Sequence, residues 1–308
     1  MPEVTVIGDV NIDLLTSPID SFPRKDLQKL VPWINLQIGG GASNFAFTIS
    51  KLGLKTRLIG LVGKDIFGEF LFKKIKEFGI ENKLRRTNKK RTGITLGVQF
   101  KDGSRSLLTF RGTNTLLSLK HFKLEEIEGK ALHIGGFNFL DSLRKDVLKI
   151  LKYGKKKGML TTLEPDIKSK INFKLKELKK IAKFVDIFFP NKFEGKMLTK
   201  EKNERKIVKK LLDFGFKIVA LKLGERGCLI GENKKLIRIK GIKIKPINPT
   251  GAGDIFNASF VFYYLKTKDI EKAGKFANAC ASLAISRKDD RFPSEKEVLK
   301  FLEKKYGR

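Results

Sequence analysis

Cysteine and histidine are scarce in this chain, which contains two of each among 308 residues. Cys228 and Cys280 are too few to build a disulfide framework, and they form no CxxC motif. His121 and His133 stand apart from each other in the sequence. The sequence therefore predicts two small buried thiols and argues against a metal cage of histidine and cysteine ligands.

Long apolar runs are also missing. No run approaches the roughly 20 residues that cross a bilayer, and "MPEVTVIGDVNIDLL" lacks the basic and then apolar order of a secretory signal. Hydrophobic residues nevertheless make up 41% of the chain, enough for a sizeable core in one large α/β domain or two ordinary ones. We expect a cytoplasmic protein that does not enter a membrane.

Acidic residues are few relative to basic ones, 33 against 65, which gives a formal net charge of +32. Such an excess can indicate a nucleic-acid-binding protein. Here the lysines are dispersed along the whole chain, as in "KKIKEF", "KYGKKKG" and "KLKELKK", and most fall on the polar faces of expected helices. This distribution argues against one nucleic-acid groove and favours either a generally basic proteome or anionic small molecules as partners.

Short β-branched runs alternate with helical stretches over most of the chain. "EVTVIGDV", "TRLIGLVG", "ALHIGGF", "MLTTLEP", "VDIFFPN" and "FKIVALKLG" are typical of buried parallel strands. Asp65 and Gly79 are typical of the start and the end of one intervening helix. The βαβ order predicts an α/β fold with helices on both faces of the sheet.

Two segments, about 14–37 and 92–112, interrupt the alternation of strands and helices and are predicted to form β structure. The second contains Asp102-Gly103 between two strand-like runs, which predicts a hairpin. Two such insertions could pair into a small sheet that closes over the carboxyl ends of the main strands. We therefore expect a single domain, 1–308, with a lid formed by the two insertions.

The segment "NPTGAGDIFNASF" is the strongest candidate for chemistry. Gly251, Ala252 and Gly253 would leave backbone amides uncovered at the start of a helix that runs from Asp254 to about Leu265, and such amides attract anions. A carboxylate beside a phosphate repels it, so Asp254 makes more sense as a base that takes a proton from an attacking hydroxyl. The alternative is an ordinary helix cap after a flexible turn.

Two other segments could hold a ligand rich in hydroxyl groups. "IGGGASNFAF" places Gly39, Gly40 and Asn44 before a helix, where the backbone is open and a carboxamide is near. Asn11 and Asp13 lie two residues apart at the end of the first strand, so both side chains point to one side. The alternative for the glycine segment is an ordinary capped helix, and the alternative for Asn11 and Asp13 is the start of a turn.

Asn191 and Glu194 lie three residues apart at a strand-to-helix junction. A carboxamide and a carboxylate at this spacing could hold a hydrated Mg²⁺ and, through it, a phosphate. A helix-capping pair is the alternative. "LKLGERGCLI" by itself is a turn, but it follows the strand nearest in sequence to the Asp254 segment.

Taken together and in this order, these segments resemble the ribokinase family, also called PfkB carbohydrate kinases. "GGGASNFAFTISKLG" resembles the first signature of the family and "NPTGAGDIFNASF" the second, with "VGKDIFGEFL", "PNKFEGKMLT" and "LKLGERGCLI" between them. The resemblance extends from "GDVNID" to "RFPSEKEVLKFLE". It implies a ribokinase-like three-layer α/β/α sandwich with a mostly parallel central sheet and a small β-sheet lid.

The resemblance also implies an ATP-dependent kinase that phosphorylates a hydroxymethyl group of a sugar, as ribokinases and fructokinases do, or of a nucleoside. Asp254 would be the base, and the backbone of Gly251, Ala252 and Gly253 the anion hole. Glu194 would serve Mg²⁺, as a ligand through water in the family pattern. Arg111 could reach the acceptor from the base of the lid or be a solvated strand end. The remaining site residues would be, for the acceptor, Asn11, Asp13, Gly39, Gly40 and Asn44, and for the nucleotide, Asn191, Lys222, Gly224, Gly227 and Asn278.

The sequence departs from the family pattern at three places. Asn248 and Pro249 replace an acidic residue and a Thr or Val, and "SRKDDR" at Ser286–Arg291 lacks the usual small residues, which argues against activation by K⁺. Lys222 replaces a common threonine. A homodimer through the lid is a further hypothesis.

Two proteins of another class remain as alternatives, a non-catalytic ligand sensor and a nucleic-acid-binding protein on the same frame. The retained Asp254 argues against the sensor. The lack of an aromatic-rich basic module argues against the nucleic-acid-binding protein.

Overall fold

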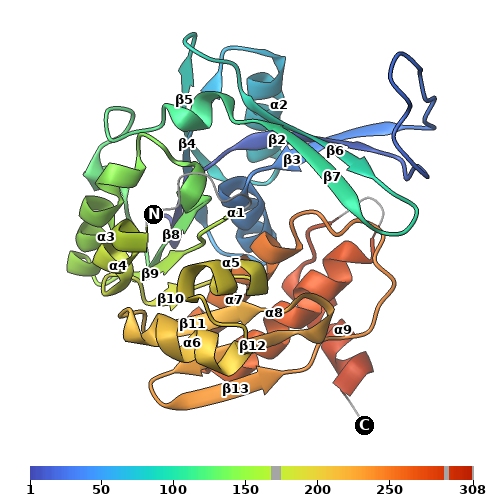
Figure 1. Ribbon diagram of the computed structural model, residues 1–308. Helices are drawn as coiled ribbons and strands as arrows, with labels where there is room; N and C mark the ends of the chain where they lie inside the picture. The colour runs from blue at the N-terminus through green and yellow to red at the C-terminus, as the bar shows by residue number, and fades with distance from the viewer. Residues whose placement is uncertain (168–174, 288–290, 307–308) are drawn as a thin grey trace.

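The computed structural model describes residues 1–167, 175–287 and 291–306, which form an α/β structure around a nine-stranded sheet (Figure 1). The strand order is β13-β12-β11-β10-β9-β8-β1-β4-β5. Neighbours from β11 to β5 are parallel, whereas β12 and β13 add an antiparallel edge. The strands are β1 Val4–Gly8, β4 Thr56–Gly63, β5 Glu81–Thr87, β8 Ala131–Gly135, β9 Leu160–Leu163, β10 Ile187–Phe188, β11 Ile218–Lys222, β12 Cys228–Glu232 and β13 Lys235–Ile239.

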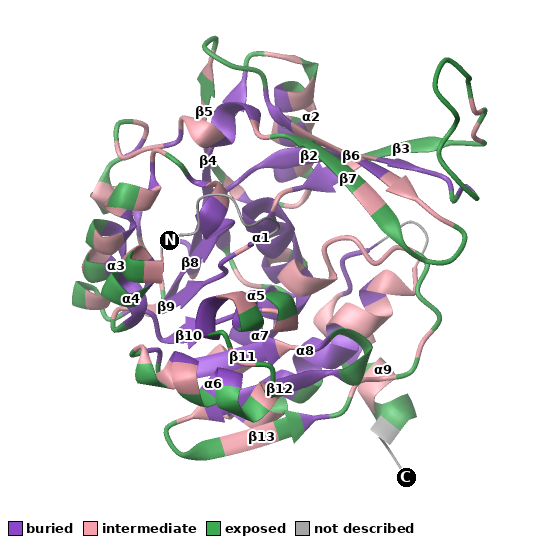
Figure 2. Cartoon of the chain, in the orientation of Figure 1, coloured by how far each residue is buried: buried purple, intermediate pink, exposed green. Residues whose placement is uncertain are grey.

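Each of the six runs expected to form a buried parallel strand contains one. Every residue of β1, β4 and β8 is buried, because helices cover the sheet on both faces (Figure 2). Val4 and Val6 belong to one apolar core and Ile7 to the other, as the alternation of side chains along a strand requires. The sheet thus separates two cores.

Helices of the two layers pack on these two cores. One layer consists of α1 Gly41–Lys51, α2 Ile66–Glu77, α7 Ala252–Thr267, α8 Ile270–Ile285 and α9 Glu295–Tyr306, and the other of α3 Val147–Lys156, α4 Leu175–Ala182, α5 Lys192–Thr199 and α6 Glu204–Asp213. This confirms the three-layer α/β/α sandwich. Asp65 caps α2 as expected, since its side chain accepts a hydrogen bond from the Gly68 amide. Cys228 and Cys280 are both free and buried.

A second, four-stranded sheet projects from one side of the main sheet (Figure 1). Its order is β3-β2-β6-β7, with β2 Asn11–Thr16, β3 Ile34–Gly39, β6 Gly93–Gln99 and β7 Arg105–Phe110. The β6–β7 pair is the expected antiparallel hairpin, and Gly103 in its turn has a φ of 84°. We refer to these four strands as the small sheet.

The structure corrects two details of the expected elements. Asn11 and Asp13 do not end the first strand, because β1 stops at Gly8 and both residues lie in β2 of the small sheet. Helix α7 begins at Ala252, two residues before Asp254, and Asp254 lies in its first turn. Among the described residues, no helix is both long enough and apolar enough to cross a membrane.

Candidate active site

Two adjoining cavities lie where the parallel strands end. One, of about 340 Å³, is lined by the small sheet and by residues that follow β1 and β9. The other, of about 850 Å³, lies between the segment after β13 and helices α7 and α8. Lys222, Gly224, Ala252 and Gly253 line both, so the start of α7 separates the two cavities. We call the first the small cavity and the second the large cavity. Their place is the expected one, because ligands of open α/β sheets bind at the carboxyl ends of the strands.

The start of α7 leaves backbone amides close to both cavities. Gly251 precedes the helix with a φ of 77°, which favours glycine. The amide of Ala252 donates to the carbonyl of Pro249 over a long 3.4 Å, and residues 251–253 belong to no strand. Helix α7 has 16 residues, and the first amides of such a helix form its positive end. The segment therefore offers an anion site between the cavities.

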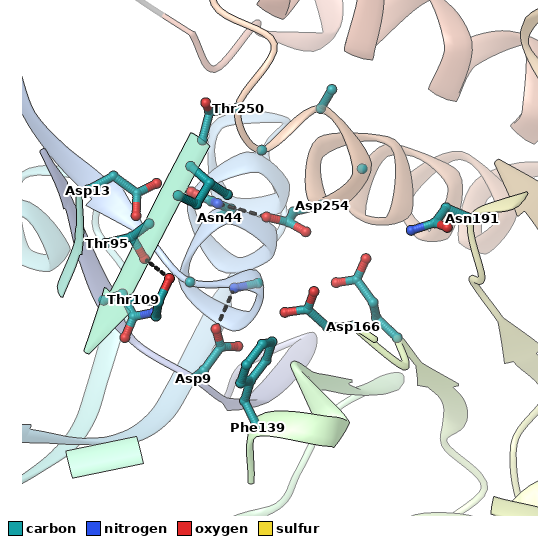
Figure 3. Close-up of a pocket in the computed structure, with 18 of the residues that line it drawn as sticks. Asp9, Asp13, Asn44, Thr95, Thr109, Phe139, Asp166, Asn191, Thr250 and Asp254 are labelled. Carbon is teal, nitrogen blue, oxygen red and sulfur yellow. Dashed lines mark hydrogen bonds between the residues drawn. The ribbon is translucent and has the colours of Figure 1, made fainter. Parts of the chain in front are cut away.

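Asp254 follows directly and lines the small cavity. Its Oδ2 accepts a hydrogen bond of 2.7 Å from Nδ2 of Asn44 on α1 (Figure 3). Burial raises the pKa of Asp254 well above its ordinary value, and the charge of Glu164 acts in the same direction, while Asn44 and Lys222 oppose them. A carboxylate with a raised pKa holds a proton more tightly, which suits a general base.

The small cavity collects most of the residues expected to hold an acceptor. Asn11, Asp13, Gly40 and Asn44 line it, although they come from β2 and from the start of α1. Gly39 is not among the lining residues. A Cβ atom at Gly39 would collide with the carboxylate of Asp13, so this glycine makes room for the Asp13 side chain.

Arg111 also lines the small cavity, but its guanidinium already has partners. Nη2 donates to the carbonyl oxygen of Phe139 at 2.6 Å and lies 2.9 Å from Oδ1 of Asp141. Arg111 follows β7 directly, at the base of the small sheet. These contacts hold the side chain against the Phe137–Phe139 turn, so Arg111 differs from a solvated strand end.

Asn191 and Glu194 form the capping box of α5 and line the small cavity at the same time. Oδ1 of Asn191 accepts from the Glu194 amide at 2.9 Å, and Oε2 of Glu194 accepts from the Asn191 amide at 2.6 Å. Oε1 of Glu194 accepts from the amide of Ile167 at 2.8 Å. Burial raises the pKa of Glu194 to about 7. The capping geometry was thus correctly foreseen as an alternative, and it does not remove the pair from the cavity.

The donor set fits a hydrated Mg²⁺ better than a metal held by protein alone. Both carboxylate oxygens of Glu194 already accept backbone amides. Among the described residues, no group of three or more His, Cys, Asp or Glu side chains is arranged to hold a metal ion. Glu164, Asp166 and Asn191 still bring oxygen atoms to the same cavity, and Mg²⁺ keeps several waters when it binds with phosphates.

The large cavity gathers four of the five residues expected along a nucleotide, and the fifth, Asn191, lines the small cavity instead. Gly224, Gly227 and Asn278 line it, and both glycines have positive φ, 64° and 84°. Nδ2 of Asn278 donates to the Lys240 carbonyl at 3.3 Å. The apolar part of the wall consists of Ile242, Ile244, Phe256, Ala281 and Ile285. This wall can pack against a flat aromatic ring, which is what a nucleotide base requires.

Lys222 and Glu164 form a buried ion pair at the boundary between the cavities. Nζ of Lys222 lies 2.7 Å from Oε1 of Glu164 and 3.1 Å from Oδ1 of Asn257. Burial raises the pKa of Glu164, but the charge of Lys222 outweighs it and leaves that pKa below its ordinary value. A Cβ atom on Gly253 would lie 3.2 Å from this Nζ, which brings the cation next to the start of α7.

Several residues of the site have no counterpart in the sequence-based expectations. Asp9 follows β1 and accepts from the first amides of α1, those of Gly41 and Ala42. Glu164 and Asp166 follow β9, and acidic residues near the carboxyl end of a strand-like run are the signal that could have found all three. Arg105 and Arg291 carried no such signal. Nη1 of Arg105, on β7, donates to Oγ1 of Thr250 at 2.8 Å.

Comparison with known proteins agrees with the fold. Residues 1–297 match the model of the pfkB family of carbohydrate kinases. The chain is 30% identical over 243 residues to an uncharacterized sugar kinase of Archaeoglobus fulgidus, covering 78% of this chain and 94% of that protein. A nucleoside kinase of Methanocaldococcus jannaschii has a similar structure, with a TM-score of 0.79, 25% identity and 99% of both chains covered. Arabidopsis thaliana ribokinase in complex with ribose and ATP has a TM-score of 0.81 at 24% identity, covering 98% of this chain and 99% of that one.

We predict that Lys222→Met lowers the free energy of unfolding by about 3–5 kcal/mol, because it leaves the Glu164 carboxylate buried without its cation. Urea denaturation at pH 7 measures this loss. The double variant Lys222→Met/Glu164→Gln should recover most of it. Lys266→Met breaks a surface pair with Glu295 and should cost less than about 1 kcal/mol. Equal losses in Lys222→Met and Lys266→Met would contradict the prediction.

Proposed function

The chain belongs to the pfkB family of carbohydrate kinases, and from this membership and the geometry of the site we propose that it transfers the γ-phosphoryl group of ATP to a hydroxymethyl group of a sugar. Members of this family are phosphotransferases that act on an alcohol group. One observation carries the proposal. The Asp254 carboxylate and the first amides of α7 lie together at the boundary of two cavities, where an alcohol from one side can meet a phosphate from the other.

The two cavities suit the two substrates. Asn11, Asp13 and Asn44 give the small cavity donors and acceptors for sugar hydroxyl groups. The large cavity, with its apolar wall and its two turn glycines, suits the base and the phosphates of a nucleotide. The Arabidopsis ribokinase of the same fold was solved in complex with a sugar and a nucleotide, ribose and ATP, which is in keeping with a site for each.

In the proposed reaction, Asp254 takes the proton of the acceptor hydroxyl as its oxygen forms a bond to the γ-phosphorus. The bond from that phosphorus to the oxygen bridging to the β-phosphate breaks, and ADP leaves. The amides of residues 251–253 and the Lys222 ammonium stabilise the charge of the moving phosphoryl group. Mg²⁺, when bound with the nucleotide, neutralises phosphate charge. Most of the rate gain then comes from position and charge.

A nucleoside kinase of the same family is the second candidate. The nucleoside kinase of M. jannaschii shares the fold over 99% of both chains, which favours keeping nucleosides among the acceptors to be tested. A ligand sensor or a nucleic-acid-binding protein is less well supported, because Asp254 and the anion site beside it lie in the small cavity.

A screen for ADP release tests the function directly. Mg·ATP is offered with sugars, sugar phosphates and nucleosides, and a coupled assay records ADP. We expect at least one sugar to give ADP well above the rate without acceptor. ADP release with nucleosides and with no sugar would favour the second candidate. Background release with every acceptor would overturn the proposal in favour of a sensor.

We predict that K⁺ does not raise the activity. The side-chain oxygen of Asn248, which stands where the family usually has an acid, accepts from the Thr250 amide at 3.1 Å and carries no charge to attract a cation. Arg291 already places a guanidinium behind Gly251. Residues 288–290 of the expected loop lie outside the described residues. Rates in KCl and in tetramethylammonium chloride at equal ionic strength should agree, and several-fold activation by KCl would contradict the prediction.

We predict that Asp254→Asn lowers kcat by about 10²–10⁴-fold, the usual contribution of a general base. The carboxamide is similar in size to the carboxylate but accepts no proton, so calorimetry should show that Mg·ATP still binds. Asp213→Asn, on α6, is the control and should leave kcat unchanged. Near-normal turnover in Asp254→Asn would reject the assigned base.

We also propose that two copies pair through the outer face of the small sheet. Register places Ile34, Leu36, Leu108 and Phe110 on one face, and their exposed fractions are 56%, 40%, 67% and 53%. An exposed apolar face of this kind favours association. Light scattering should give twice the chain mass of 34.9 kDa, and Leu108→Lys should reduce it to one chain. Leu27→Lys, outside this face, should not. A wild-type monomer would contradict the proposal.

A further inference from the structure

Arg291 is a buried arginine with incomplete hydrogen bonding. Its exposed fraction is 8%, and it lies in the segment between α8 and α9. Nη2 donates to Oδ1 of Asn44, 247 residues away in sequence. Within the described part of the chain, Nε and Nη1 have no hydrogen-bond partner. A buried cation with unpartnered donors is energetically unfavourable. The burial of Arg291 is therefore better explained by a role in the site than by a contribution to stability.

The position of Arg291 is closely defined by the start of α7. A Cβ atom on Gly251 would lie 2.8 Å from Nη2 of Arg291 and 3.1 Å from Nδ2 of Asn44. The lack of a side chain at Gly251 therefore leaves room for both groups. The guanidinium lies behind the anion site, and its contact in the site is Asn44.

The Asn44 carboxamide joins Arg291 to the proposed base. A carboxamide has an accepting end and a donating end. Arginine can only donate, so Oδ1 of Asn44 must face Arg291, and the opposite end must then be Nδ2. Nδ2 donates to Oδ2 of Asp254 at 2.7 Å (Figure 3). The arginine thus selects one of the two orientations of the amide.

We propose that Arg291 is a positioning residue for the transfer reaction. It fixes the Asn44 carboxamide so that Asn44 donates to Asp254 and holds that carboxylate ready to take the proton of the acceptor hydroxyl. The inference rests on the proposed role of Asp254 as the base. It adds a residue that is 247 positions from Asn44 in sequence and gives Asn44 a second role beside acceptor binding.

The charges around Asp254 give the direction of the effect. Burial, Glu164 and Asp166 raise the pKa of Asp254, while the Asn44 hydrogen bond and Lys222 lower it. Burial lowers the pKa of Arg291, and the charges of Asp13 and Asp254 oppose it. Without Arg291, the Asn44 amide can turn and present its oxygen to Asp254, which favours the protonated acid. The pKa of Asp254 then rises, and the base is protonated over a wider pH range.

The pH dependence of kcat/KM tests the proposal, with the acceptor identified by ADP release. In Arg291→Gln, the acidic limb should move up by about one pH unit, because glutamine can accept as well as donate. Arg291→Lys keeps a pure donor and a positive charge, so its acidic limb should stay near that of the wild type. The control is Arg287→Gln, which removes an arginine that pairs with Glu297 at 2.6 Å and should not move the limb. Equal limbs in Arg291→Gln and the wild type would overturn the proposal.

Two further measurements distinguish this relay from a direct charge effect and from a failure of the proposed function. In the Asn44→Ala background, Arg291→Gln should cause no further shift, since the amide that transmits the effect is gone; a full further shift would show a direct charge effect and overturn the relay. Infrared titration of the carboxyl band lost in Asp254→Asn measures the pKa of Asp254 without any acceptor. A higher midpoint in Arg291→Gln supports the relay even if no acceptor is phosphorylated, and an unchanged midpoint rejects it. A rise in melting temperature with Mg·ATP checks that each variant is folded.

Discussion

The positive end of α7 meets the carboxyl ends of the parallel strands, and the rest of the site depends on this meeting. It requires a left-handed residue at Gly251, a helix long enough to carry a dipole, and a main sheet whose strands stop at the same level. The small sheet then closes one side of the junction and the segment after β13 the other. The cavities are consequences of where α7 begins.

Several carboxylates lie close together at this junction, and a different local interaction stabilises each of them. Asp9 accepts the first amides of α1, Glu194 accepts two backbone amides, and Glu164 has Lys222. Asp254 accepts the Asn44 amide, and burial and the charge of Glu164 raise its pKa well above the ordinary value. Burial also raises the pKa of Glu194, to about 7, but both of its carboxylate oxygens already accept backbone amides. Asp254 is therefore the acid at this junction that combines a raised pKa with a place beside the start of α7.

The sequence revealed the layers and most of the site because these depend on local patterns. Alternating runs located the strands of the main sheet, and the glycines before Asp254 located the start of α7 to within two residues. The small sheet was also foreseen, but not that Asn11 and Asp13 belong to it, since a two-residue gap after β1 leaves no pattern. The Asn191–Glu194 spacing could not distinguish a cap from a ligand site, because the observed geometry serves both. Arg105 and Arg291 escaped notice because their partners lie 145 and 247 residues away. Contacts over such separations follow from the tertiary fold and not from periodicity.

The hydrogen bond between Arg105 and Thr250 ties the far end of β7 to the residue just before the helix start. Both residues line the small cavity, so the bond joins two of its walls. Arg105 remains exposed, and an exposed hydrogen bond of this kind adds little stability by itself. The contact therefore joins the small sheet to the segment before α7 at little energetic cost, and its loss would free these two walls of the small cavity from each other.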